Sequence, residues 1–442
     1  MKIKNQNNKM NELIKDNKDK NDKINNLEYK YNEIIDKINK LDKLVKLNTK
    51  EENKIKLIYR TEKEGNYRLF GKNFIERNKN NIEVKVNDYK IDLKNENNLK
   101  RGDNIIKIKI INPINDFSEM FFECSSLYDI SSLEKWDVSN CTNFSYMFYG
   151  CNLLSNIKSL EKWNVSNCTN FSYMFYGCNK LSNIKLLEKW NVSNCTNFSN
   201  MFRGCSSLSD ISPLKNWNTL NCNNFSNMFY NCSLLSDISP LEKWNVSNGN
   251  DFSYMFGNCL SLSNISSLKN WNISNKFMIN KCPSTSDFIL KPYNFSHMFY
   301  GCKSLLDISS LEKWNVSNSN NFSHMFFGCK SLLDISSLEK WNVSNCKDFS
   351  YMFYECKSLS DISPLKNWNV SNCINFSFMF YGCSSLSNIK SLEKWNVSNS
   401  KDFSFMFYEC ESLSDISSLE NWNVINGSNF SYMFYGCSSL SS

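Results

Sequence analysis

The sequence has little of what enzymes and membrane proteins depend on. It contains only two histidines and no G-x-S-x-G motif, P-loop or paired acidic cleft, so we expect no catalytic residues and no cofactor. No apolar run approaches the roughly 18 residues of a membrane span. The opening stretch, MKIKNQNNKMNELIKD, lacks the apolar core of a secretory signal. We therefore expect no membrane span and a cytoplasmic location, or a cell-surface location if a signal or anchor lies outside these residues.

Basic charge is scarce where nucleic-acid binding would need it. The chain of 442 residues has a formal charge of +7, yet residues 1–108 hold 27 Lys and Arg against 18 Asp and Glu. The rest of the chain holds 24 against 26, so it is nearly neutral. Because binding to phosphate backbones requires a basic face, we expect no nucleic-acid partner.

Close C-x2-C pairs, which mark many zinc sites, are also absent. The 19 cysteines fall mainly at two fixed places, 17 residues apart, in a repeated unit. A cysteine that recurs once per unit beside apolar neighbours is typical of a small buried hydrophobe. We expect free thiols in a core, with neither disulfides nor metal.

What the sequence does contain is a 27-residue unit, first complete as WDVSNCTNFSYMFYGCNLLSNIKSLEK at residues 136–162. All eleven tryptophans belong to it, and they are 27 apart except for one step of 43. Such a period predicts a repeat solenoid whose units stack and share a core. We expect about twelve coils over residues 112–442. At the roughly 4.8 Å spacing of hydrogen-bonded strands, they would offer a surface large enough for a macromolecular partner.

Each coil is expected to combine short strands with a short helical turn. Leu154, Ile157 and Leu160 fit an extended segment, and residues 163–165 fit a second strand-like arm. Residues 170–178 begin with capping residues and reach a glycine, which predicts a short helix. The inward positions should form the structural core, represented by Trp136, Trp163, Trp190, Phe148, Phe175, Met147, Met174, Cys151 and Cys178.

The first 50 residues are rich in lysine and asparagine and carry a heptad of apolar residues between about 24 and 47. Its seam consists of Ile24, Leu27, Tyr31, Ile34, Ile38, Leu41 and Val45. This spacing predicts a coiled coil, most simply a parallel homodimer. A single helix packed on the next domain is the alternative.

Residues 54–111 change to a period of two, which predicts a small β-rich domain that caps the first coil. Strands are expected at 54–60, 67–70, 82–93 and 104–111. A turn is expected at Gly65-Asn66, a helix at 73–77, and a hairpin turn at Asn87-Asp88.

The repeat pattern C-x-S-L-x-D-I-x-x-L-x-x-W-N-V-S-N-x-x-N-F-S-x-M-F-x-x-C resembles that of BspA-like leucine-rich-repeat surface proteins. The resemblance covers about residues 115–442 and includes twelve Met-Phe pairs. It implies a right-handed, leucine-rich-repeat-like solenoid used for adhesion or protein–protein contact. This sequence departs from that family in showing no secretion signal.

Two regions are candidate partner-binding sites. One is a column of acidic and amide residues beside the inward Leu and Ile, where Asp210, Asp237, Asp307, Asp334 and Asp361 would face a partner. The other is an insertion at residues 276–293, where the tryptophan step lengthens. Its apolar residues Phe277, Met278, Phe288 and Ile289 would fold back or meet a partner.

The two histidines, His297 and His324, occupy the same place in successive coils. They look like half a metal site, but their column otherwise holds Tyr, Asn, Phe or Glu, so we interpret them as chance surface residues. The sequence thus predicts a non-enzymatic protein–protein interaction scaffold of unknown partner. The alternatives are a cell-surface adhesin and the targeting arm of a larger protein with an effector or catalytic domain beyond Ser442.

Overall fold

A computed structural model of the chain describes residues 27, 29–40, 54–273 and 292–440. The chain divides into two compact units, residues 1–55 and 56–442, which we describe separately. In the first unit, residues 29–40 are helical and exposed. The rest of the predicted heptad, including Ile24, Leu41 and Val45, lies outside the described residues.

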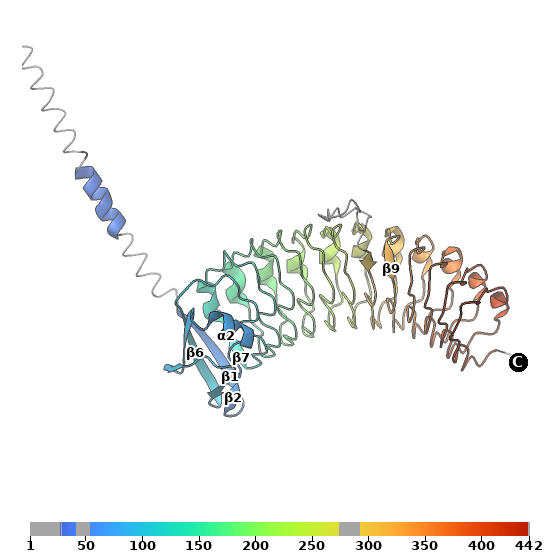
Figure 1. Cartoon of the computed structure of the whole chain (residues 1–442), viewed down its shortest axis with the longest axis horizontal. Coiled ribbons are helices and arrows are strands. Elements are labelled where there is room, and N and C mark those ends of the chain that lie inside the picture. Colours follow the sequence, from blue (N-terminus) through green and yellow to red (C-terminus); the bar gives the residue numbers. More distant parts are fainter. Residues whose placement is uncertain (1–26, 28, 41–53, 274–291, 441–442) are drawn as a thin grey trace, which may run out of the picture. The chain divides into compact units, whose positions relative to one another are not determined.

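The second unit begins with small antiparallel sheets and a short helix (Figure 1). The larger sheet has the strand order β4-β3-β6-β1-β7, and β2 pairs with β5. The elements are β1 (Lys54–Thr61), β2 (Gly65–Tyr67), α2 (Lys72–Asn78), β3 (Ile82–Val86), β4 (Tyr89–Ile91), β5 (Asn97–Leu99), β6 (Gly102–Ile110) and β7 (Leu127–Asp129).

The predicted hairpin turn at Asn87-Asp88 is confirmed. It joins β3 to β4, and both residues take the positive φ angles, 47° and 74°, of a tight hairpin. The turn expected at Gly65-Asn66 is wrong, because both residues lie in β2 and pair with β5. The strand expected at 67–70 is also absent beyond Tyr67. Leu69 and Phe70 are buried but lie outside any strand. Apolar residues alone therefore did not show whether this stretch is a strand or a buried loop.

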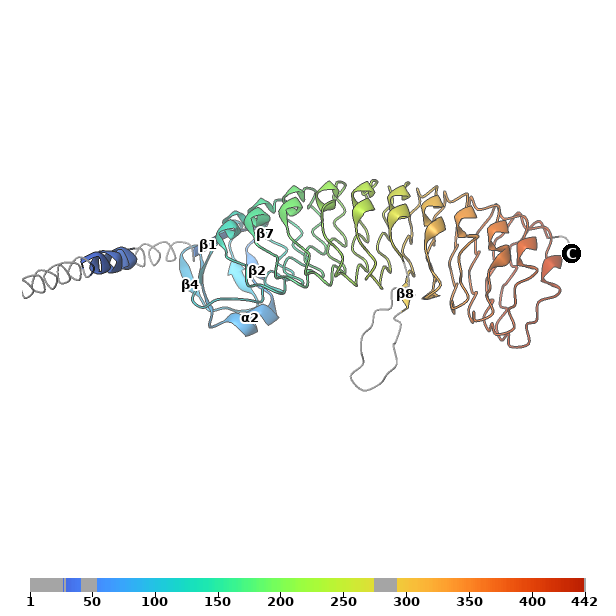
Figure 2. The ribbon, with the colours of Figure 1, turned by 90° about the horizontal axis from the view of Figure 1, so that it is seen from above.

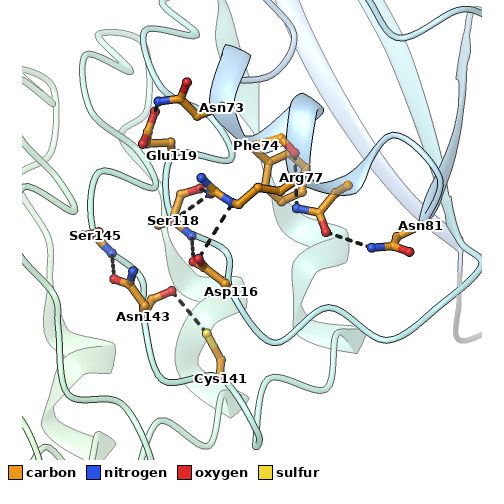
Figure 3. A network of polar contacts seen from close by, with 11 residues as sticks. Asn73, Phe74, Arg77, Asn81, Asp116, Ser118, Glu119, Cys141, Asn143 and Ser145 are labelled. Carbon is orange, nitrogen blue, oxygen red and sulfur yellow. Dashed lines mark hydrogen bonds and ion pairs between the residues drawn. The ribbon is translucent and has the colours of Figure 1, made fainter.

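This small domain packs on the first coil. β1 pairs with β7, which belongs to that coil, through Ile58 opposite Asp129 and Tyr59 opposite Leu127. In Figure 3, α2 reaches the same coil through polar side chains. Arg77 donates to the carbonyl oxygen of Ser118 at 2.6 Å.

Each coil contains a ribbon of consecutive turns, which we call the turn ribbon, residues 170–178 in the third coil. The helix predicted there is wrong. Alternate N–H groups donate to the next coil, as Phe171 does to Asn197 at 3.0 Å, and the intervening ones donate three residues back, as Met174 does to Phe171 at 3.2 Å. A continuous helix is impossible because Tyr173 has a φ of 60°. The inward residues were nevertheless predicted correctly, since Met174 is fully buried.

A 3-10 helix occupies the opposite part of the coil, where an extended segment was predicted through Leu160. Ile157 precedes the helix, and its carbonyl accepts the N–H of Leu160 at 2.9 Å. The 3-10 helices are η1 (Ser131–Lys135), η2 (Lys158–Lys162), η3 (Lys185–Lys189), η4 (Ser212–Leu214), η5 (Ser239–Lys243), η6 (Ser266–Asn270), η7 (Ser309–Lys313), η8 (Ser336–Leu338), η9 (Ser363–Asn367), η10 (Lys390–Leu392) and η11 (Ser417–Leu419).

The core between ribbon and 3-10 helix holds the residues that the sequence predicted. Those named as its representatives are all at most 7% exposed: Trp136, Trp163, Trp190, Phe148, Phe175, Met147, Met174, Cys151 and Cys178. The indole N–H and thiol groups of this core find acceptors in the preceding coil. The indole of Trp163 donates to the carbonyl of Leu133 at 2.8 Å, and the thiol of Cys178 donates to that of Phe148 at 3.2 Å.

The described cysteines are all free and buried, as the repeat spacing predicted. Burial raises the pKa of the Cys168 thiol to about 12, so this group stays protonated and acts as an apolar side chain with a weak donor. Asparagines form a further ladder, in which the amide of Asn167 donates to the carbonyl of Ser139 at 2.8 Å.

Successive coils lie side by side in sequence order (Figures 1 and 2). Parallel bridges join them, and the long tryptophan step does not interrupt the pattern. Across that step Asp251 bridges to Asn294, and the indole of Trp314 donates to the carbonyl of Leu268 at 3.1 Å. A short strand within that step, β8 (Tyr293–Asn294), pairs in parallel with β9 (Ser319–Asn321) of the next coil.

Candidate binding face of stacked aromatic rings

The turn ribbon carries two outward side chains in each coil, and most of them are aromatic. In the third coil they are Tyr173 and Tyr176, which are half-buried. We call the two series the first and second aromatic columns, and together the aromatic face. The first column comprises Tyr146, Tyr173, Tyr254, His297, His324, Tyr351, Phe378, Phe405 and Tyr432. The second comprises Phe122, Tyr149, Tyr176, Tyr230, Tyr300, Phe327, Tyr354, Tyr381, Tyr408 and Tyr435.

The first column is built on an unusual backbone conformation. In each of the twelve coils, the residue at this position has a left-handed backbone conformation, with φ between 56° and 60°. Glycine and asparagine adopt this conformation most readily, whereas a bulky side chain there costs on the order of 1–2 kcal/mol. Asn200 and Asn227 occupy the place in two coils, so an aromatic ring is not needed to form the turn.

Rings within a column stack on one another. In the first column, successive centroids lie 4.0–5.1 Å apart with planes within 24° of parallel. In the second column the separations are 4.3–5.0 Å and the planes agree within 18°. The two columns also touch, since the rings of Tyr351 and Tyr354 are 5.7 Å apart. Each such pair contributes about 0.5–1.5 kcal/mol, which offsets part of the backbone strain.

This stacking limits what the face can bind. A ring whose two sides are covered by neighbours at about 4.3 Å, as Tyr351 is by His324 and Phe378, has no free side for a sugar or a nucleobase. What remains accessible is ring edges and tyrosine hydroxyl groups. Rigid amphipathic rings of this kind are enriched where proteins bind proteins, because little side-chain entropy is lost.

The aromatic face is interrupted by asparagine in the first column of the fourth and fifth coils, and by a cation in the second column of the fourth. The guanidinium carbon of Arg203 lies 5.4 Å from the ring centroid of Tyr176 and 4.5 Å from that of Tyr230, so it replaces a ring in the second column. Its Nη1 donates to the amide oxygens of Asn200 at 3.3 Å and Asn227 at 3.1 Å. Arg203 is half-buried.

The two histidines belong to the first column. Their rings stack at 4.1 Å, between Tyr254 at 4.0 Å from His297 and Tyr351 at 4.3 Å from His324. Burial lowers the pKa of His297 to about 3 and that of His324 to about 4, and the neighbouring His324 adds to the shift at His297. Parallel rings do not converge on a shared ion. Within the described ranges, no group of three or more His, Cys, Asp or Glu is placed to hold a metal.

The acidic column lies elsewhere, at the start of the 3-10 helices. Asp210, Asp237, Asp307, Asp334 and Asp361 are all exposed, and each accepts a backbone N–H from the serine two residues on, at 2.7–2.8 Å. Asparagine does the same in other coils, as Asn156 does for Lys158 at 3.0 Å. These side chains therefore close a local turn, whether or not they also meet a partner.

The same side of the coils carries mixed charges. Lys340 pairs with Glu312 of the preceding coil at 2.7 Å, and Lys162 pairs with Glu134 at 3.5 Å. Exposed pairs of this kind contribute roughly 0–1 kcal/mol. The depressions between neighbouring 3-10 helices are lined by these charges, and Asp361 lines one of them.

The other predicted partner-binding residues, Phe277, Met278, Phe288 and Ile289, lie outside the described residues. The sequence reasoning missed the aromatic face, although a signal for it was present. The second and fifth residues after the ribbon phenylalanine, as Tyr173 and Tyr176 follow Phe171, are aromatic or histidine in most coils. Aligned by coil, these places recur at the same 27-residue period as the tryptophan column, with other residues in a few coils.

The fold and this face define a tandem-repeat protein whose coils share one core and expose stacked rings. The chain belongs to the family described as "Mycoplasma protein of unknown function, DUF285", whose model matches it in tandem copies over residues 97–210, 179–289, 290–389 and 360–442. The comparison found no matching curated protein and no matching solved structure. In the part of the chain that the structure describes, no helix has the length and hydropathy to cross a bilayer.

Proposed function

We propose that the chain is a non-enzymatic scaffold, a leucine-rich-repeat-like solenoid that binds a protein partner through its aromatic face. The observation that carries this proposal is the left-handed backbone conformation of the residues in the first column. Asparagine takes that conformation in two coils, yet nine coils keep an aromatic or histidine ring at this position and leave it partly exposed. A strained backbone that presents large rings to solvent is the kind of feature found at binding sites.

Three ladders support the solenoid architecture. Ribbon N–H groups donate to the following coil, while indole and asparagine side chains donate to the preceding one. Contacts between neighbouring coils alone then build a long continuous surface. The resemblance of the repeat to BspA-like proteins favours the same class of function, contact with another protein.

A substitution series tests the face without disturbing the fold. Tyr351, Phe378 and Phe405 are changed to asparagine, the residue that already takes the left-handed place at Asn200 and Asn227. We expect the triple variant to keep its circular dichroism spectrum and nearly its unfolding midpoint, because relief of backbone strain offsets lost stacking. In affinity capture from the source cells, the triple variant should no longer retain the proteins that the native chain captures.

The matched control changes three exposed residues on the 3-10 side, Glu312, Lys340 and Lys366, to alanine. It should capture the same proteins as the native chain. If the asparagine variant captures the native set, the aromatic face is not the binding surface. If both variants lose it, the binding is not confined to one side.

The first unit is proposed to pair two copies of the chain. Leu27, Tyr31, Ile34 and Ile38 repeat at heptad spacing on residues 27–40 and are 51–66% exposed. Burying such a seam against a second copy forms a parallel coiled coil. Light scattering should give a dimer for the full chain and a monomer for the Ile34→Lys, Ile38→Lys variant. A native monomer would refute the pairing.

The small domain is proposed to cap the first coil. Phe70 stacks on Phe121 at 6.0 Å, and the N–H of Gly71 donates to the carbonyl of Met120 at 3.0 Å, which are contacts made elsewhere by a preceding coil. Removing residues 1–111 should expose this end and cause self-association, measured by light scattering. A monodisperse truncated chain of native circular dichroism would contradict the capping role.

A further inference from the structure

Arg203 is the single arginine between residues 102 and 442, and it lies on the aromatic face. The two rings beside it and the two asparagine amides below it hold the guanidinium in one orientation. A cation fixed in this way loses little side-chain entropy on binding a ligand.

Within the part of the chain that the structure describes, the guanidinium of Arg203 has no acidic partner. Among the described residues, Arg60, Arg68 and Arg77 each pair with a carboxylate, whereas Arg203 pairs with none. Its hydrogen bonds in this part of the chain use only Nη1. Nε and Nη2, which carry three of the five N–H groups of an arginine, keep their donors for a ligand.

We propose that Arg203, between Tyr176 and Tyr230, is the anchor for a carboxylate side chain in an acidic segment of the protein partner. The proposal deepens the function proposed above and rests on it. Two parallel N–H···O bonds from a guanidinium suit a carboxylate, and they gain strength on a surface that rings shield from water. The flanking ring edges and hydroxyl groups then contact residues beside the acid.

A polyanion is a poorer fit than an acidic peptide. Binding to nucleic acid or an anionic membrane requires many cations along the surface. The aromatic face has one arginine, and the chain beyond residue 108 is nearly neutral. Rings inside the stacks, such as Tyr351, also have both faces covered and offer none to a base. A single fixed cation among apolar edges recognises one charge within an otherwise apolar segment.

The test uses a phage-displayed library of random 12-residue peptides, selected on the immobilised full chain. Selected peptides are then synthesised, with amide versions of each acidic residue, and their affinities are measured by fluorescence anisotropy. The variants are Arg203→Met, which removes the charge, and Arg203→Lys, which keeps it without the planar fork. Lys180→Met removes an exposed charge from the preceding coil as the control. Urea midpoints identify any variant that loses its fold.

We expect the selected peptides to share an acidic residue. Arg203→Met should weaken their binding at least tenfold, Arg203→Lys should restore only part of it, and Lys180→Met should leave it unchanged. Changing the acid to its amide should weaken binding to the native chain but not further to Arg203→Met. Peptides without an acidic preference, or with equal affinity for Arg203→Met, would overturn the anchor.

The two proposals fail in different ways. One outcome is that peptides bind Arg203→Met as tightly as the native chain but lose affinity for the variant with asparagine in place of Tyr351, Phe378 and Phe405. That result would refute the role of Arg203 as an anchor and leave the proposed binding role of the aromatic face standing. Peptides insensitive to both sets of variants, or a selection that yields no binding peptide, would overturn both.

Discussion

Replacing Asp334 separates a folding role of the acidic column from a binding role. Its Oδ1 accepts the N–H of Ser336 at 2.7 Å and its Oδ2 accepts the hydroxyl at 3.0 Å, at the start of η8. The same backbone bond is made by an amide oxygen where Asn388 accepts from Lys390 at 2.8 Å. An oxygen acceptor is therefore required there, and a negative charge is not.

The magnitudes follow from this geometry. Asp334→Asn keeps the backbone bond, so the free energy of unfolding should stay within about 0.5 kcal/mol of the native value. Asp334→Ala removes both bonds and should cost about 1 kcal/mol, the usual loss for a capping side chain. The same change at Asp307, Asp334 and Asp361 together should cost roughly 3 kcal/mol if the sites act independently.

Urea unfolding followed by tryptophan fluorescence measures these differences, because the indoles are buried between coils. Equal stability of the alanine and asparagine variants would refute the capping account. A further variant changes Asp307, Asp334 and Asp361 together to asparagine. If it keeps its stability but no longer captures the partner, the charge of this column contacts the partner, as the sequence predicted.

Three other changes test the core and the histidines. Phe175→Ala should cost about 3–5 kcal/mol, because it leaves a cavity in a stack of fully buried rings, and urea unfolding should show it. Trp341→Phe should cost about 2–3 kcal/mol on the same measure, because the carbonyl of Leu311 loses its indole donor at 3.0 Å, and an unchanged midpoint would contradict this account. The histidine pKa values are lowered in the folded chain, so the unfolded chain binds more protons below about pH 6.5 and stability should fall as pH drops towards 4. Allowing for solvent screening, the loss is roughly 1 kcal/mol per histidine. Replacing His297 and His324 by phenylalanine should remove this component from midpoints measured between pH 7.5 and 5.

The period of the repeat reveals which residues are inside, but not the backbone that puts them there. Phe171, Met174, Phe175 and Cys178 are spaced as on one side of a helix, and they are indeed buried. An α-helix and the turn ribbon bury the same four residues, but they differ in the φ angle of Tyr173 and in the hydrogen-bond partners. Those partners are carbonyl groups 26 residues further on, which no local pattern shows.

The candidate site was missed for a related reason. A side chain such as Tyr173 looks like an isolated surface ring within its own coil, and only stacking on Tyr146 at 4.3 Å makes it part of a face. The acidic column was easier to see because alternating Asp and Asn stand out in the sequence. Its exposure was predicted correctly, whereas its bond to the next serine was not.

The bonds between coils run in both directions and are the same at nearly every junction, even where the tryptophan step is 43 residues. Loss of any 27 consecutive residues within the regular stretch would rejoin two surfaces that already fit each other. Loss of 26 would move every inward ring out of register. An array shortened by whole repeats would therefore keep its fold and change only the length of its aromatic face.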